Sequence, residues 1–304
     1  MNAVLLAAAT HTDQAVRSSV AHARLAAELC LARAGVAPEH VGLLINTGIY
    51  RDQNLIEPAM AALIQCDLGI TPDYARDGGT VAALSFDLLN GACGVISAIQ
   101  VAQAFLAEDQ VQHVLITASD AHPSLAAHRP SSFPYDATGA AMLLTRGSDP
   151  RSGFGQVAAT SILKGGETIS GYSDLTIPQG QARHETIVQT DPDATELLAH
   201  HASRLAEEYA AQHGLDLNRT RLIVSRTTPG LGAAVAERLG VPRRNLVDRD
   251  PSAPAPHTAS LIADYLAAQD SDHLGPASPV MFLAAGAGPA SACVVYHPIP
   301  EGPR

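Results

Sequence analysis

The sequence contains no tryptophan, only four cysteines in 304 residues, and no run of lysine or arginine. The cysteines lie far apart without a CxxC pair, which argues against a disulfide framework or a zinc site. A formal net charge of -11 argues against nonspecific binding to nucleic acid or anionic membranes. No run of about 18 uncharged apolar residues occurs, and the first residues lack the basic segment of a signal peptide. We therefore expect a cytoplasmic protein with reduced thiols and without membrane or nucleic-acid partners.

The composition that is present indicates a compact globular protein. Hydrophobic residues make up 46% of the chain and charged residues 16%, which is typical of folded chains. The length suffices for one large domain or two of ordinary size with a substantial core. Outside the motifs discussed below, the histidines show no spacing with carboxylates that would suggest metal ligands. We therefore predict no metal site.

The order of predicted elements repeats in the two parts of the chain. Residues 24–48 read as an amphipathic helix, a glycine stop at Gly35 and a buried strand. Residues 204–230 show the same order, with a glycine stop at Gly214 before the strand. Chance similarity of alanine-rich helices is the alternative explanation, but the order of helix, glycine, strand and turn matches twice. The repetition predicts a duplicated architecture.

Each part alternates helices with short apolar strands such as HVLITASD, residues 113–120, which is typical of sheets covered by helices. We therefore predict an α/β fold with an N-terminal half at residues 1–190 and a C-terminal half at residues 191–304. Residues 152–186 are rich in glycine, serine and threonine, and they read as a strand-and-loop connection between the halves.

Cys93 lies in a turn between a predicted strand, residues 86–89, and a helix that runs from Val95 onward. At a helix N-terminus, unpaired N–H groups and the helix dipole stabilise an anion, which favours the thiolate. The same N–H groups could hold the oxyanion that forms on an acyl group attached to the sulfur. Gly91 and Gly94 leave room for a substrate to approach. These features favour a nucleophile over a buried structural cysteine.

The other three cysteines read as structural. Cys30 lies in the middle of a predicted helix, Cys66 in an apolar segment and Cys293 in a predicted strand. Cysteine often serves as a small buried apolar residue. We expect all three thiols to be buried and inert.

The segment FDLLNGACGVISAIQVAQAFL, followed by HVLITASD, resembles the active-site region of the thiolase superfamily, specifically of ketoacyl-acyl-carrier-protein synthase III and its relatives. Similar segments follow in the family's order: FPYDATGAAMLL, LIVSRTTPGLGAAVAERLGV, PHTASLIADYL and FLAAGAGPASACVVY. The resemblance implies a five-layered αβαβα fold of two duplicated halves and a homodimer. It also implies no resident cofactor, because acyl-CoA or a phosphopantetheinyl acyl carrier protein is the substrate.

The family's condensing members use a Cys–His–Asn triad, and this chain departs from it at two positions. Arg226 stands where the family has histidine, and arginine cannot act as a base near pH 7. His257 stands at about the place of the asparagine and could deprotonate Cys93 or an incoming alcohol or amine, unless it only binds backbone or solvent. Arg226 could bind an acceptor carboxylate or a phosphopantetheine-linked group, or form a structural ion pair. Gly286 and Gly288 match the glycine turn that lines the family's active site.

The resemblance therefore implies an acyltransferase in which Cys93 is the acyl acceptor and His257 the base, acting on oxygen, nitrogen or carbon. Polyketide or other specialised metabolism is suggested by analogy only. One alternative is a decarboxylating β-ketoacyl-acyl-carrier-protein synthase III, and another is a non-catalytic partner subunit that has kept the fold. The presence of NGACG in this chain argues against the second, because a subunit without catalysis has no reason to keep a thiol in this turn. Because the chain has few aromatic residues, the sequence offers no obvious filter for substrate specificity. Three arginines could form a basic patch that binds a carrier protein: Arg238, Arg243 and Arg244.

Overall fold

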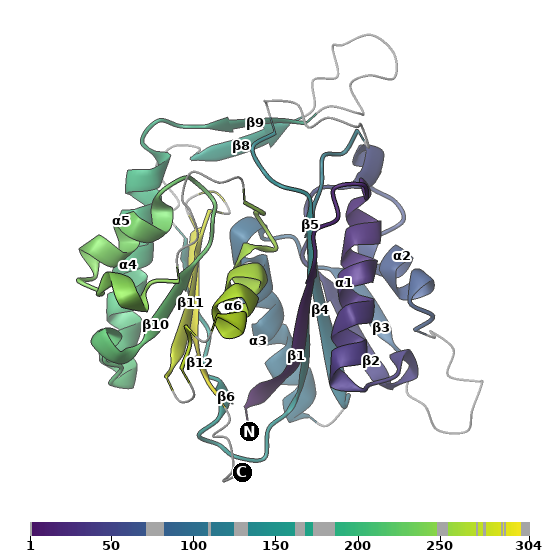
Figure 1. Cartoon of the computed structure of the whole chain (residues 1–304), viewed down its shortest axis with the longest axis horizontal. Coiled ribbons are helices and arrows are strands. Elements are labelled where there is room, and N and C mark those ends of the chain that lie inside the picture. Colours follow the sequence, from purple (N-terminus) through teal and green to yellow (C-terminus); the bar gives the residue numbers. More distant parts are fainter. Residues whose placement is uncertain are drawn as a thin grey trace.

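The structure is a computed structural model that describes residues 2–70, 82–108, 111–124, 133–161, 168–172, 186–247, 255–271, 273–275, 278–286, 288 and 290–298. Figure 1 shows five layers, in which two sheets alternate with three layers of helices. Helices α1 and α2 cover one outer face, α4 and α5 the other, and α3 and α6 lie between the sheets. The αβαβα layering expected from the sequence is confirmed.

The first sheet has five strands, of which β2 pairs parallel with β3 and β4, whereas β5 pairs antiparallel with β1 and β4. The edge strand β3 ends at the turn that carries Cys93. In spatial order the strands are β1 (Ala3–His11), β5 (Thr138–Arg146), β4 (His113–Asp120), β2 (Val41–Asn46) and β3 (Leu84–Asp87).

The second sheet places β11 between a parallel neighbour, β10, and an antiparallel one, β12. Both β6 and β7 pair with β12, so the first two strands after residue 152 join the second sheet. The boundary between the halves at residue 190 stays a prediction, since strand pairing alone does not decide it. The strands are β10 (Arg221–Val224), β11 (Val280–Ala285), β12 (Ala290–His297), β6 (Gly153–Phe154) and β7 (Ala158–Ser161).

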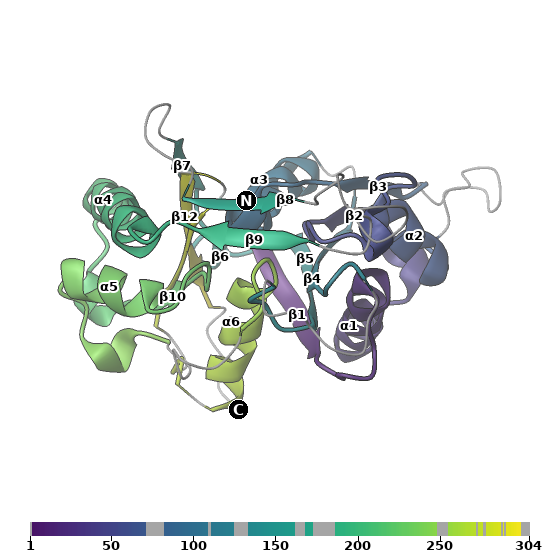
Figure 2. The same ribbon diagram turned by 90° about the horizontal axis from the view of Figure 1, so that it is seen from above.

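A separate two-stranded sheet, β8 (Ile169–Tyr172) with β9 (Ile187–Thr190), lies over the space between the two large sheets. Figure 2, seen from above, shows these two strands running across that space from the side of β12 toward β2. They cover the part of the molecule in which the candidate site lies.

The helices follow from the apolar pattern that the sequence carries. In α3, buried Val95, Ile99, Ala102 and Leu106 share one helical face, as their spacing predicts. Glycines in the left-handed region end α1 at Gly35 and α4 at Gly214, as expected. The helices are α1 (Ser19–Ala34), α2 (Met60–Asp67), α3 (Gly94–Ala107), α4 (Ala194–His213), α5 (Leu231–Arg238) and α6 (Ser260–Asp270).

The main hydrophobic core fills the space between the two sheets, where α3 and α6 pack against inward-facing residues of both. Short 3-10 helices connect several elements, at Pro38–His40, Asp52–Asn54, Gly91–Cys93, Leu217–Arg219 and Arg243–Asn245. Within the described ranges, no helix is both long and apolar enough to cross a membrane. The same ranges hold no cluster of three or more side chains suited to a metal ion.

Candidate active site

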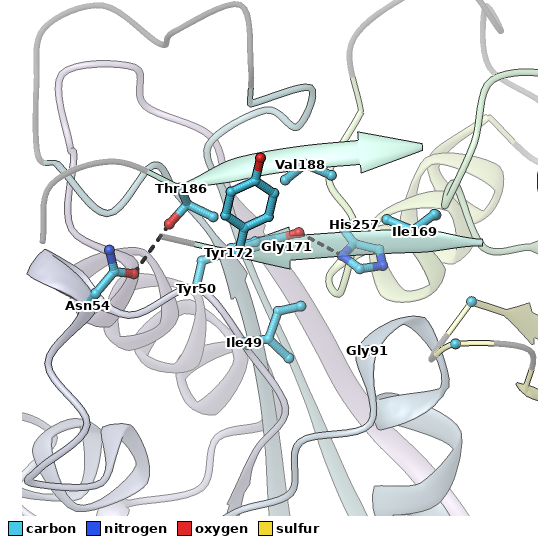
Figure 3. A pocket seen from close by; sticks show the side chains of 12 residues that line it. Ile49, Tyr50, Asn54, Gly91, Ile169, Gly171, Tyr172, Thr186, Val188 and His257 are labelled. Carbon is cyan, nitrogen blue, oxygen red and sulfur yellow. Dashed lines mark hydrogen bonds between the residues drawn. The ribbon is translucent and has the colours of Figure 1, made fainter. Parts of the chain in front are cut away.

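A cavity of about 360 Å³ lies where the Cys93 turn, the N-terminal approach to α6 and the β11–β12 turn meet. Four residues singled out from the sequence line it, namely Gly91, His257, Gly286 and Gly288. Figure 3 shows the side chains of β8 and β9 over the same space. The other lining residues are Ile49, Tyr50, Asn54, Ile169, Gly171, Tyr172, Thr186 and Val188.

Cys93 is the last residue of the 3-10 turn Gly91–Cys93 and the N-cap of α3, which is the helix N-terminus that the sequence predicted. Its side chain is buried, and it is not itself among the residues that line the cavity. The Sγ atom lies 3.9 Å from the carbonyl oxygen of Ala290, which also accepts the N–H of Gly286 at 3.0 Å. The sulfur therefore lies against the β11–β12 turn, and Gly286 and Gly288 of that turn line the cavity.

The backbone N–H of Cys93 donates to the carbonyl of Asn90 at 3.0 Å. This hydrogen bond occupies a donor that could otherwise hold an oxyanion on the sulfur's acyl group. The backbone N–H of Cys93 is therefore not available to hold the oxyanion, in contrast to the expectation from the sequence.

In the turn between β11 and β12, which contains Gly286 and Gly288, the first position requires glycine. Gly286 has φ 119°, and a Cβ atom there would lie 2.3 Å from Cγ2 of Thr227. Only glycine fits such a position, because it lacks the Cβ atom and tolerates positive φ. Gly288 also has a positive φ, 62°, but a Cβ atom there would meet nothing within 4 Å. The close approach of backbone to Thr227 thus fixes the wall of the cavity.

His257 is 4% exposed and precedes α6. Its Nδ1 atom lies 3.1 Å from the hydroxyl of Tyr50, and its ring stacks on Tyr135 with centroids 4.6 Å apart and planes inclined by 14°. The Nε2 atom is buried without a hydrogen-bond partner, and Figure 3 shows it turned away from Tyr50. Burial lowers the pKa of His257 from 6.5 to about 4, so the ring is neutral at pH 7.

Asp120, the last residue of β4, holds the backbone at His257. Its carboxylate accepts the N–H groups of His257 at 2.9 Å, Thr258 at 3.1 Å and Ala259 at 3.0 Å, and the Thr258 hydroxyl at 2.9 Å. Burial raises the pKa of Asp120 to about 6, although these hydrogen bonds oppose the rise. Sequence reasoning did not single out this residue. An acidic side chain at the end of a mostly buried strand was the available signal.

The rings of Tyr50 and Tyr135 contact His257. Tyr50, Phe133 and Tyr135 form a small buried cluster, in which Tyr50 meets Phe133 edge to face with centroids 4.8 Å apart. Burial, first of all, raises the pKa of Tyr50, and the same cause raises that of Tyr135. The aromatic residues are few, yet these three gather beside the cavity, whose lining includes Tyr50. The segment HRPSSFPYD, residues 128–136, has a composition that suggests a loop lining the pocket, and residues 128–132 lie outside the described residues.

Arg226 is not among the residues that line the cavity. Its Nε donates to Oδ2 of Asp264 on α6 at 2.7 Å, and both side chains are largely buried. Its backbone N–H donates to the hydroxyl of Ser260 at 3.3 Å. Of the roles left open by the sequence, the structural ion pair is the one present here.

The remaining cysteines divide into two kinds. Cys30 and Cys293 are buried, and burial raises the pKa of each thiol to about 12, so both stay protonated at neutral pH. Cys66 lies exposed on α2, and the expectation that it is buried is wrong. Its segment is apolar, but position 66 falls on the outer face of a helix that buries Met60, Ala61 and Ile64.

The basic patch expected from Arg238, Arg243 and Arg244 is partly neutralised, because Arg238 forms an ion pair with Glu196.

No family model matches the chain. In sequence it is 31% identical over 104 residues to an acyl-CoA:acyl-CoA alkyltransferase from Xanthomonas campestris, a match that covers 34% of this chain and 27% of that relative. The matched segment thus spans about a quarter of the relative's length.

In structure the chain is similar to 3-oxoacyl-(acyl carrier protein) synthase III from Pseudomonas aeruginosa, with a TM-score of 0.80, 16% identity and full coverage of both chains. It is similar to the priming β-ketosynthase of a polyketide biosynthetic pathway, with a TM-score of 0.80, 18% identity, and 99% and 97% of the two chains covered. At this identity the likeness concerns the fold. The chain therefore has, over its whole length, the thiolase-like fold found in ketoacyl synthase III enzymes.

Proposed function

We propose that the protein is an acyltransferase in which Cys93 takes an acyl group from a coenzyme A or acyl-carrier-protein thioester and passes it to an acceptor. The observation that carries the proposal is the meeting of three features at one cavity. These are the turn before α3, the glycine turn that touches the Cys93 sulfur, and the neutral imidazole of His257 with a buried, unpartnered Nε2. An unpaired buried polar atom is costly, which favours a site that a ligand completes.

In the loading step, the proton of the Cys93 thiol passes to Nε2 of His257, and the sulfur attacks the thioester carbonyl. The tetrahedral intermediate then breaks its bond to the donor sulfur, and the donor thiol leaves with the proton held by His257. In the transfer step, an acceptor O–H or N–H gives its proton to the same nitrogen and attacks the acyl-enzyme. The Cys93 sulfur leaves and recovers the proton, so the enzyme returns to its initial state.

Arg226 supports transfer to oxygen or nitrogen over decarboxylative condensation. The condensing triad needs a neutral histidine donor where this chain has an arginine, and that arginine is paired with Asp264. Carbon acceptors stay within the proposal because the matched relative is named for joining two acyl-CoA molecules. The likeness to a priming ketosynthase suits a place in polyketide or other specialised metabolism.

The proposal is tested by intact-protein mass spectrometry after mixing with a panel of acyl-CoA and acyl-carrier-protein thioesters. We expect a mass gain of one acyl group in the wild type that is absent in Cys93→Ala. Cys66→Ala is the matched control, because Cys66 is the exposed thiol on which nonspecific acylation would occur. A mass gain that persists in Cys93→Ala and disappears in Cys66→Ala would overturn the proposal. Absence of any adduct would favour a non-catalytic partner subunit.

A further inference from the structure

The two-stranded sheet of β8 and β9 covers the candidate active site with one of its two faces. Cross-strand pairing places Gly171 opposite Val188 and Ile169 opposite Thr190, so these residues share a face. Ile169 packs against the hydrophobic core between the second sheet and α4, and Val188 packs against the aromatic cluster around Tyr50. Ile169, Gly171 and Val188 all line the cavity (Figure 3). This face is therefore the inner one.

Gly171 leaves a gap in the inner face. Ile169 and Val188 flank it with apolar side chains, and Thr186, just before β9, donates its hydroxyl to Oδ1 of Asn54 at 3.3 Å. A Cβ atom built at Gly171 would meet no described atom within 4 Å. Because Gly171 itself lines the cavity, the gap is part of the space that a ligand can use.

The backbone does not explain why this residue is glycine. Gly91, Gly286 and Gly288, the other described glycines that line the cavity, have φ values of 49°, 119° and 62°, which favour glycine. Gly171 is not among the residues with positive φ, and it lies in a regular antiparallel ladder. A glycine inside a strand weakens that strand and often marks a place where a ligand approaches closely.

We propose that Gly171 is a specificity-determining residue, whose missing side chain leaves room in the cavity for the acyl chain of the substrate. A chain that begins at the Cys93 sulfur can reach this space, because the turn that contacts the sulfur also lines the cavity through Gly286 and Gly288. That the occupant is an acyl chain rests on the proposed function. That position 171 limits the size of the occupant does not.

The side chains around the gap favour a hydrocarbon chain over the pantetheine arm of the donor. Ile169 and Val188 offer no hydrogen bonds, whereas the amides of a pantetheine arm need hydrogen-bond partners when they are enclosed. The hydroxyl of Thr186, the nearest polar side chain on the same face, already donates to Asn54. An apolar chain needs no such partner.

The cavity is small enough for one added side chain to matter. Its volume of about 360 Å³ is near the lower end of the range of about 300–1,000 Å³ that is typical of small-molecule sites. Gly171→Val puts an isopropyl group into this volume without a clash at Cβ, and valine suits a strand better than glycine. We therefore expect the variant to fold and its cavity to hold less.

Titration calorimetry with alkyl-CoA thioethers tests the inference, because a thioether has no carbonyl for a thiol to attack and reports binding alone. Ethyl-CoA and decyl-CoA provide a short and a long chain on the same arm. In Gly171→Val we expect the affinity for decyl-CoA to fall by about 10-fold or more, the scale of a change of bulk in an apolar pocket, and that for ethyl-CoA to stay unchanged. Gly171→Ala should give a smaller fall in the same direction.

Ser170→Val is the matched control. It adds the same side chain at the neighbouring position of β8, on the opposite face, and Ser170 is not among the residues that line the cavity. We expect this variant to keep both affinities of the wild type.

An equal fall for both thioethers in Gly171→Val would assign the gap to the coenzyme A arm and overturn the inference. Unchanged affinities in Gly171→Val, or a wild type that binds decyl-CoA no more tightly than ethyl-CoA, would overturn it as well. These affinities do not depend on catalysis. Absence of an acyl adduct on Cys93 in the mass-spectrometry experiment would instead overturn the proposed function, while the affinities decide the role of Gly171.

Discussion

His257 changes what this corner of the site can do with a proton. An asparagine amide, the residue of the resembled triad, donates and accepts hydrogen bonds but does not take up a proton near neutral pH. A neutral imidazole can, and the low pKa that burial gives it keeps the lone pair available from about pH 5 upward. The replacement therefore puts a group that can take up a proton at about the position where the resembled triad has an amide.

The burial of His257 also predicts a pH-dependent stability. Because its pKa falls from 6.5 to about 4 on folding, the unfolded chain binds a proton that the folded chain does not. His257 thus contributes stability above pH 6.5 that is lost as the pH falls toward 4. Relative to His257→Asn, we expect the wild-type unfolding free energy in urea to drop by about 3 kcal/mol between pH 7 and pH 4. Asp120, whose raised pKa acts in the opposite sense, is present in both proteins.

A difference between the two proteins that stays constant over this range would contradict the buried, neutral state of His257. A rise toward low pH would do so as well.

Because Arg226 forms a largely buried ion pair with Asp264, we expect its replacement to lower the stability of the protein rather than its affinity for substrate. Arg226→Met removes the ion-pair partner of Asp264, whose side chain is 3% exposed, and we expect a loss of about 3 kcal/mol in unfolding free energy. The double variant Arg226→Met/Asp264→Leu is the matched control, because replacing both charges by apolar groups should restore most of the loss. An unchanged stability together with a raised KM would instead assign Arg226 to substrate binding.

At the scale of elements, the turn between β11 and β12 forms part of the cavity wall and also contacts the Cys93 sulfur. Gly286→Ala brings a Cβ atom to 2.3 Å from Thr227, whereas Gly288→Ala meets open space at a similar sign of φ. We expect Gly288→Ala to cost about 1–2 kcal/mol from positive φ alone, and Gly286→Ala to cost clearly more. Thermal unfolding and the yield of acyl adduct measure both effects. Equal losses in the two variants would contradict the close approach at Thr227.

The elements themselves could be predicted well from the sequence. The strand His113–Asp120 and the helix stops at Gly35 and Gly214 have the predicted bounds, because apolar period and glycine chemistry are local signals. The strand before Cys93 lies two residues earlier than predicted, at Leu84–Asp87, since Leu88 leaves the sheet after donating its N–H to Asn46.

The surroundings of the candidate site could not be predicted in the same way. Tyr50 and His257 are 207 positions apart, and no local pattern links them. Asp120 holds three N–H groups more than a hundred residues away, which only the tertiary fold brings together. Gly286, Gly288 and His257 were predicted from a resemblance in the order of motifs. The residues that contact His257 could not be predicted, because only tertiary packing brings them close to it.

At the scale of the whole molecule, the edge strand β3 predicts association with a second copy. Leu84 is 49% exposed on that strand, Leu89 is 51% exposed just after it, and Ile56 is 75% exposed. Exposed apolar residues on an open sheet edge favour pairing with another chain. We expect a dimer by light scattering, and a monomer for Leu84→Lys/Leu89→Lys with an unchanged circular dichroism spectrum. A monomeric wild type would contradict the homodimer.

The whole chain shares its fold with ketoacyl synthase III enzymes, and the proposed acyl transfer depends on Cys93 as the nucleophile. The most direct measurement is peptide mapping of the wild-type protein after brief exposure to an acyl-CoA donor, with quenching and digestion in acid. We predict the acyl group on the peptide that contains Cys93 and on no other cysteine peptide. Acylation confined to the peptide of exposed Cys66 would contradict the proposed acyltransferase.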